Sequence, residues 1–159
     1  MLKKILWVED GAEAELFNML APIYVTGLYD LTIAANATEA VERLEASEFA
    51  AVIVDIRLPP GRDPQWVDIY GKYHENRDAA RLGLHLLRAL FAPGSTSIRL
   101  SSEKKEWIVG ERFAVFSVET DLANELREMG IGIYEQKNAR TPRTKVLEII
   151  RRLANASKG

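Results

Sequence analysis

The sequence predicts a doubly wound α/β domain built on a five-stranded parallel sheet. Short apolar runs alternate along the chain with segments in which apolar residues recur three and four positions apart. The run Phe49–Val54 is apolar at every position and rich in β-branched residues. A strand that is apolar on both faces belongs in the middle of a parallel sheet that helices cover on each side. Strands alternating with helices therefore indicate parallel βαβ units with right-handed crossovers.

Each apolar run is expected to form a strand, and each periodic segment a helix. The expected strands are Ile5–Val8, Leu31–Ala35, Phe49–Val54, Phe113–Val118 and Ile131–Lys137. The expected helices are Ala12–Leu20, Ala37–Leu44, a short one that begins at Asp63-Pro64, Ala79–Phe91, Leu122–Met129, and a last one capped by Thr141-Pro142. We expect a short hairpin over Ile98–Val109. Residues 1–155 are expected to form one domain, followed by a frayed tail at 156–159.

The composition is that of an ordinary globular domain and excludes several kinds of site. The formal net charge is −2 and both signs are interspersed, so we expect no direct nucleic-acid binding. The chain has no cysteine, which excludes disulfides and thiolate metal sites and suits a reducing compartment. No apolar run approaches the roughly 20 residues of a membrane span. We therefore expect a cytoplasmic protein that does not associate with membranes.

Charged side chains follow three of the predicted strands at the point where each strand ends. Glu9 and Asp10 follow the first strand, Asp55 follows the third, and Lys137 ends the fifth. The carboxyl ends of the first and third strands are neighbours at the switch point of a doubly wound sheet, where such sheets bind their ligands. Three crowded carboxylates repel one another unless a cation lies among them. Hard oxygen ligands without histidine or cysteine favour Mg²⁺, with Mn²⁺ as an alternative, and the lysine ammonium completes a site for phosphoryl oxygens.

This constellation resembles the receiver domain of two-component response regulators, a flavodoxin-like fold with strand order 2-1-3-4-5. That family has an acidic pair after strand 1, a phosphoacceptor aspartate after strand 3 and a serine or threonine after strand 4. It also has an aromatic residue in strand 5 and a lysine at the end of that strand. Here Glu9-Asp10 match the acidic pair, Asp55 the phosphoacceptor, Tyr134 the switch aromatic and Lys137 the lysine. The resemblance covers about residues 3–154, apart from two insertions.

The resemblance implies a metal-dependent phosphoryl transfer to Asp55. Mg²⁺ would be held by Asp10, Asp55 and the backbone carbonyl of Arg57, with Glu9 acting mainly through bound water. Lys137 would pair with a phosphoryl oxygen.

The hydroxyl of strand 4 would bind another phosphoryl oxygen, and Tyr134 would turn in behind it as the switch. Ser117 is favoured for this hydroxyl because it lies within the apolar run, whereas Thr120 lies beyond it. A third reading would make 98–102 the strand, but Arg99 suits a central strand poorly. Asn138 departs from the family pattern, because a proline usually follows the lysine.

Two insertions also depart from the pattern. The segment 61–82 follows strand 3 directly beside Asp55, and it delays the expected glycine of the next helix to Gly83. Its apolar residues Trp66, Ile69, Tyr70 and Tyr73 share one helical face, which we expect to pack against the domain. The second insertion, 94–112, precedes strand 4 and is expected at the opposite end of the sheet, away from the site.

Arg57 and Glu119 stand two residues after Asp55 and two after Ser117. These positions flank the route of hydrolytic water in the family. We predict that the two side chains pair across the site and slow the loss of the phosphoryl group.

The leading interpretation is a stand-alone, phosphorylatable receiver and not an enzyme, with at most slow self-dephosphorylation. Its partners would be a sensor histidine kinase or phosphotransfer protein, and a downstream protein bound through Leu122–Met129, Ile131–Lys137 and the last helix. The alternative is a degenerate receiver that acts as a phosphorylation-independent interaction module, which the first insertion and Asn138 motivate. A phosphatase of the haloacid-dehalogenase type would need an acid where Arg57 stands, and a Toprim-type site would need one at the same position.

Overall fold

The computed structural model describes residues 1–101 and 103–156 and contains one parallel sheet of five strands. The strands are β1 (Lys3–Val8), β2 (Tyr29–Ala34), β3 (Ala51–Val54), β4 (Phe113–Ser117) and β5 (Ile133–Gln136). Their order across the sheet is β2-β1-β3-β4-β5, and every neighbouring pair is parallel. The predicted fold class and strand order are therefore confirmed.

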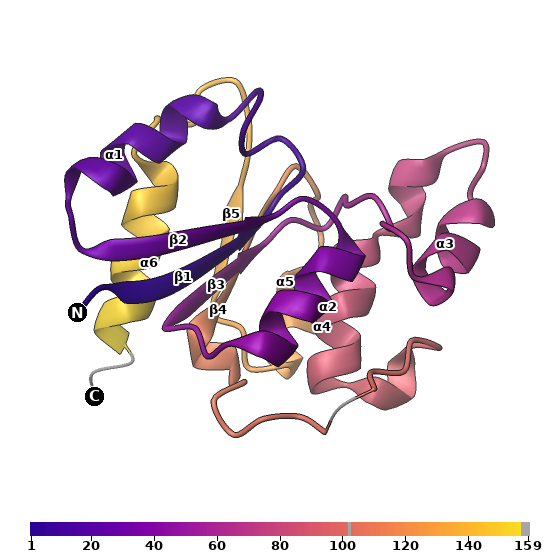
Figure 1. The fold of residues 1–159 in the computed structure, drawn as a ribbon. Coiled ribbons are helices and arrows are strands. Elements are labelled where there is room, and N and C mark those ends of the chain that lie inside the picture. Colours follow the sequence, from indigo (N-terminus) through magenta and orange to yellow (C-terminus); the bar gives the residue numbers. More distant parts are fainter. Residues whose placement is uncertain (102, 157–159) are drawn as a thin grey trace.

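Helices cover both faces of the sheet (Figure 1). They are α1 (Leu20–Val25), α2 (Ala37–Ala46), α3 (Pro64–Gly71), α4 (Leu82–Phe91), α5 (Ala123–Glu128) and α6 (Lys145–Ala156). Short 3-10 turns add η1 (Phe17–Met19), η2 (Arg77–Ala80), η3 (Pro93–Ser95) and η4 (Gly110–Arg112). Figure 1 shows α1 and α6 on one face, α2, α4 and α5 on the other, and α3 projecting beyond them. None of the helices in the described part of the chain has the length and apolar character needed to cross a membrane.

The core lies in two layers, one on each face of the sheet. Along β1, Ile5 and Trp7 pack toward the α1–α6 face, while Leu6 and Val8 pack toward the other. Every residue of β3 is buried, as its unbroken apolar sequence predicts for a central strand. The sheet thus places the carboxyl ends of β1, β3 and β4 side by side.

The first helix differs from its prediction. The sequence pattern favoured Ala12–Leu20, but residues 10–16 form turns and the helix begins only at Leu20. Pro22 lies in the first turn of α1, where a missing N–H is tolerated. The apolar face was correctly identified, because Met19 is buried and Leu16 and Leu20 pack against the α1–α6 core layer.

The first insertion contributes to the core through α3. Asp63 caps this helix by accepting a hydrogen bond from the Gln65 N–H at 2.9 Å, and Pro64 follows at the first helical position, as expected. Trp66 and Ile69 are buried in the core layer on the α2–α4 face, which confirms their predicted packing. Tyr70 packs partly against it. Tyr73, the fourth member of the expected face, is exposed.

The second insertion contains no strand among its described residues, so the predicted hairpin over Ile98–Val109 is wrong. In place of a partner strand, a side chain forms hydrogen bonds with the backbone at Arg99. Arg99 exchanges two hydrogen bonds of 2.8 Å with the Gln65 side chain, where a hairpin would need a partner strand. The segment therefore reaches the first insertion, and its predicted isolation at the far end of the sheet holds only for its later part, where Trp107 contacts Phe49 and Phe113.

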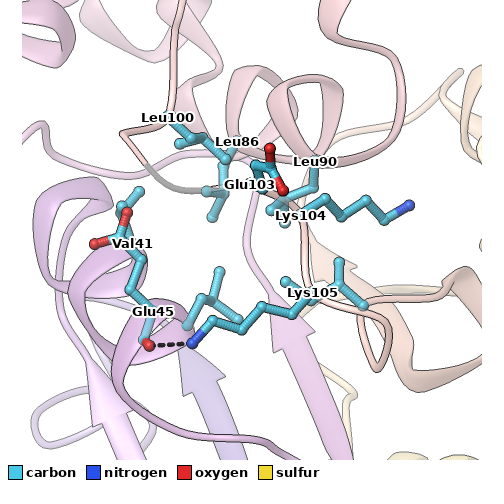
Figure 2. A pocket seen from close by; sticks show the side chains of 10 residues that line it. Val41, Glu45, Leu86, Leu90, Leu100, Glu103, Lys104 and Lys105 are labelled. Carbon is cyan, nitrogen blue, oxygen red and sulfur yellow. Dashed lines mark hydrogen bonds between the residues drawn. The ribbon is translucent and has the colours of Figure 1, made fainter.

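The same connection packs along α2 and α4 and encloses an apolar pocket of about 20 Å³ there (Figure 2). Val41, Leu86, Leu90 and Leu100 line this pocket, and Lys105 donates a hydrogen bond to the Glu45 carbonyl at its rim. A volume of this size is about that of one or two water positions. The pocket is a packing feature of the second insertion.

The last helix begins at Lys145 and not at Thr141-Pro142. Thr141 instead closes the loop before it, because its hydroxyl accepts a hydrogen bond from the Asn138 N–H at 2.9 Å. The expected fraying concerned 156–159, of which residues 157–159 lie outside the described part of the chain.

Candidate functional site

Backbone hydrogen bonds align the ends of the central strands. The Asp55 N–H donates to the Val8 carbonyl at 3.0 Å, and the Glu9 N–H donates to the Ala34 carbonyl at 2.9 Å. Both ladders therefore extend one residue beyond the assigned strands. Parallel pairing of Val8 with Val54 then sets the acids that follow them side by side at the switch point.

Three carboxylates and one ammonium meet at this edge. One oxygen each from Glu9, Asp10 and Asp55 lie within 4.8 Å of one another. Lys137 Nζ lies 2.9 Å from Glu9 Oε2 and 2.9 Å from Asp55 Oδ2. Glu9 and Asp55 are each only 4% exposed to solvent. The structure thus brings together four of the residues that the sequence singled out.

In both Glu9 and Asp55, one carboxylate oxygen accepts a backbone hydrogen bond and the other contacts Lys137. Asp55 Oδ1 accepts the Arg57 N–H at 3.3 Å, and Glu9 Oε1 accepts the Gly11 N–H at 3.4 Å. The second oxygen of each carboxylate faces Lys137. Both contacts to backbone N–H groups are long, so these oxygens retain free lone pairs for a further ligand.

The electrostatics of the cluster favour a cation. Burial, followed by the neighbouring Asp55 carboxylate, raises the pKa of Glu9 to about 8 despite the attraction of Lys137. Burial and the charge of Asp55 also raise the pKa of Asp10. Burial lowers the pKa of Lys137, but the charges of Asp55 and Glu9 outweigh it, and the net shift is upward. The site therefore carries more negative charge than its single lysine offsets.

This donor set fits Mg²⁺ or a similar hard cation. Glu9, Asp10 and Asp55 offer convergent oxygens without nitrogen or sulfur ligands, and Asp10 is exposed at the solvent side of the group. A divalent ion among them would relieve the repulsion that raises the pKa values of Glu9 and Asp10.

Two further residues predicted from the sequence lie at the neighbouring strand end. Ser117 is the last residue of β4 and is fully buried, and its Oγ accepts the Glu119 N–H at 3.2 Å. The Lys137 N–H donates to the Ser117 carbonyl at 2.8 Å, which joins this strand end to that of β5. Thr120, the competing hydroxyl, is exposed in the loop beyond β4. Tyr134 on β5 is half-buried, and its hydroxyl donates to the Glu119 carbonyl.

The predicted pairing of Arg57 with Glu119 is present. Arg57 Nε donates to Glu119 Oε1 at 2.9 Å across the gap between the ends of β3 and β4. Glu119 is 8% exposed, and this hydrogen bond is the largest cause of the raised pKa of Arg57.

Two residues of the first insertion form ion pairs with Arg57 and Glu119. Arg81 Nη2 lies 3.4 Å from Glu119 Oε2, and Asp78 Oδ2 lies 3.4 Å from Arg57 Nη1. Arg81 is also held in the left-handed region at φ 48°, which is costly for a residue other than glycine. Residues 77–81 are therefore tied by two ion pairs to the residues that flank the site.

The sequence did not identify Asp78 or Arg81 as site residues. Both residues lie within the insertion 61–82, and no periodicity places a charged loop residue relative to a strand end. The nearest available signal was the length of the insertion, which begins four residues after Arg57 and ends at the next helix.

A close backbone contact positions α4 beside Asp55. The Gly83 N–H donates to the Ile56 carbonyl at 2.9 Å, and a Cβ at Gly83 would lie 1.9 Å from the Asp55 carbonyl oxygen. Only glycine permits this approach. The glycine expected in the delayed helix therefore packs directly against the backbone of Asp55.

Comparisons with solved structures identify the fold. Over 99% of its length the chain is similar to a CheY-like response-regulator receiver domain protein from Methanospirillum hungatei JF-1, with 22% identity, 98% of that chain covered and a TM-score of 0.57. It is also similar to the signal receiver domain of a putative LuxO repressor protein from Vibrio parahaemolyticus, with 15% identity, 99% and 95% coverage and a TM-score of 0.59. A third similar structure is the chemotaxis response regulator CheY4 of Vibrio cholerae, with 14% identity, 96% and 99% coverage and a TM-score of 0.56. No protein-family model and no curated protein sequence matches the chain. The resemblance predicted from the sequence is thus confirmed at the level of the fold.

Proposed function

Because the chain has the fold of response-regulator receiver domains, we propose that it accepts a phosphoryl group on Asp55 and signals through the resulting change in shape. The observation that carries this proposal is the contact of Lys137 Nζ, at 2.9 Å, with both Glu9 and Asp55 within a cluster of three carboxylates. An ammonium beside a carboxylate nucleophile and a cation-binding acid pair is the arrangement that phosphoryl transfer to a carboxylate needs.

In the proposed reaction an Asp55 carboxylate oxygen attacks the phosphorus of a donor phosphohistidine. An O–P bond forms as the P–N bond breaks, and the electron pair of the broken bond stays on the imidazole nitrogen. Mg²⁺ held by Asp10, Asp55 and the Arg57 backbone carbonyl, and by Glu9 mainly through bound water, would supply positive charge that offsets the charge of the transferring group. Lys137 binds a phosphoryl oxygen and loses its present contact with the Asp55 carboxylate.

The signal would pass through the end of β4. Ser117 Oγ now accepts the Glu119 N–H, and its hydroxyl proton is available to a phosphoryl oxygen. Movement of this hydroxyl toward the phosphoryl group would draw the 118–121 loop with it. Tyr134 is bonded to the Glu119 carbonyl in this loop and would follow, so the change reaches the surface of β5.

The partners proposed are a sensor histidine kinase or phosphotransfer protein as donor, and a downstream protein that reads the surface formed by α5, β5 and α6. We propose a cytoplasmic protein that binds neither membranes nor nucleic acid directly. Its only enzymatic activity would be slow self-dephosphorylation.

The test is incubation with Mg²⁺ and a small phosphodonor, followed by intact mass measurement. The wild type should gain the mass of one phosphoryl group, and Asp55→Asn should gain none. Equal labelling of both proteins would refute the assignment of Asp55, and labelling of neither would refute the function.

A phosphorylation-independent interaction module is the second candidate. The observation that favours it is the tie of residues 77–81 to Arg57 and Glu119, because an insertion fixed beside the site restricts the approach of a donor protein. A Mg²⁺ titration separates the two candidates. Absence of binding at millimolar metal supports the interaction module, while saturable binding that Asp55→Asn abolishes supports the phosphoacceptor.

A further inference from the structure

A small pocket opens between the acid cluster and the first insertion. Its volume is about 70 Å³, and Asp10 forms its wall on the side of the cluster. Three arginines line it: Arg57 from the end of β3, and Arg77 and Arg81 from the insertion. Asp78 is its second acid. Residues of the insertion thus form one side of a cavity whose other side is a predicted metal ligand.

The insertion presents arginine donors that its own acids do not satisfy. Arg77 stacks over the Tyr70 ring with its Cζ 5.4 Å from the ring centroid, and no carboxylate of the described chain lies within 4.0 Å of it. Arg81 makes one ion pair, at 3.4 Å, and its side chain remains 43% exposed. A guanidinium has five N–H donors, so both side chains keep several for an incoming oxygen anion.

The size of the pocket limits what it can hold. A space of about 70 Å³ accommodates a few water positions, and hence a group of two to four heavy atoms. A carboxylate has three heavy atoms and two acceptor oxygens, which suit the fork geometry of arginine.

We propose that Arg77 and Arg81 are specificity-determining residues that favour small acyl phosphates as phosphodonors by binding the departing carboxylate in this pocket. The inference rests on the proposed phosphorylation of Asp55 and adds the class of donor. In this reaction the O–P bond to Asp55 forms while the bond between phosphorus and the acyl oxygen breaks. The electron pair remains on the carboxylate, which leaves without needing a proton.

The charge on the leaving group is what the arginines distinguish. An acyl phosphate develops negative charge on the departing oxygen, and donors aimed at that charge stabilise the transition state more than the bound donor. Phosphoramidate, by contrast, releases neutral ammonia from a protonated nitrogen. Arginines at the leaving-group position should therefore accelerate the first reaction and leave the second nearly unchanged.

The experiment measures phosphorylation rates with Mg²⁺ and either acetyl phosphate or phosphoramidate, using intact mass as the readout. Arg77→Gln and Arg81→Gln should each lower the rate with acetyl phosphate about tenfold, as expected for one lost charge-assisted hydrogen bond, and change the rate with phosphoramidate less than about twofold. Lys72→Gln is the matched control, because it removes one positive charge from the same insertion but does not line the pocket. It should change neither rate.

Arg81→Lys provides a second variant that keeps the charge but loses the fork of donors, and it should recover only part of the acetyl phosphate rate at an unchanged melting temperature. Equal losses with both donors, or no loss with either, would overturn the inference while leaving phosphorylation of Asp55 intact. A wild type that neither donor labels would overturn the proposed function itself.

Discussion

Replacing Gly83 with alanine tests how α4 is held against the end of β3 at Asp55. The added Cβ would lie 1.9 Å from the Asp55 carbonyl oxygen and 2.8 Å from the Ile56 Cα, whereas ordinary contacts begin at 3.4 Å. Both neighbours are backbone atoms next to a buried strand, so they cannot rotate away. The start of α4 must instead move outward by about 1.5 Å, and the Gly83–Ile56 hydrogen bond is lost.

The cost follows from what α4 buries. Its leucines at 82, 84, 86, 87 and 90 all lie in the core, so a displaced helix disturbs the packing on the whole α2–α4 face. Overpacking of a core costs about 1–3 kcal/mol, and we expect the upper end, about 3 kcal/mol, because the clash is with backbone. For a chain of this length that lowers the melting temperature by about 6–12 °C.

The assay is urea unfolding, with Gly71→Ala as control. Gly71 is also helical, and a Cβ there meets nothing within 4 Å, so alanine should stabilise the protein by up to about 1 kcal/mol. A loss below about 1 kcal/mol for Gly83→Ala, or equal effects of the two substitutions, would refute the close approach of α4 to Asp55.

Two further predictions concern the site. Because the pKa of Glu9 is raised to about 8, a metal ion must displace the Glu9 proton at lower pH. The affinity for Mg²⁺ should therefore rise about tenfold per pH unit up to about pH 8. In calorimetric titrations, Glu9→Gln should flatten this dependence. Arg57→Ala and Glu119→Ala should each shorten the half-life of the phosphorylated form several-fold, because either change opens the 2.9 Å pair beside Asp55 to water. Unchanged half-lives in a dephosphorylation time course would show that the pair does not protect the phosphoryl group.

The sequence predicted the elements of the site that depend on the sheet. Apolar runs locate β1, β3, β4 and β5, and parallel strands bring their carboxyl ends to one edge. The sequence therefore assigns Asp55, Glu9 and Lys137 to one cluster. Their positions follow from periodicity and topology alone.

The elements that the sequence did not predict depend on single residues and on irregular backbone. Residues 10–16 form turns, and the first helix begins at Leu20, eight residues after its predicted start at Ala12. The Gln65 side chain took the hydrogen bonds that would have made Arg99 part of a hairpin. The return of Arg81 to Glu119 depends on a left-handed backbone at a residue other than glycine, which no pattern in the sequence indicates.

Chemical mapping of the phosphoryl group shows directly whether Asp55 accepts it. After incubation with Mg²⁺ and a small phosphodonor, borohydride reduces an aspartyl phosphate to homoserine, and peptide mass spectrometry locates the altered residue. We expect homoserine at position 55 and no reduced side chain at any other acid. Homoserine at position 10, 2-amino-5-hydroxypentanoic acid at position 9, or an unmodified chain under conditions where the protein is folded would refute phosphorylation of Asp55.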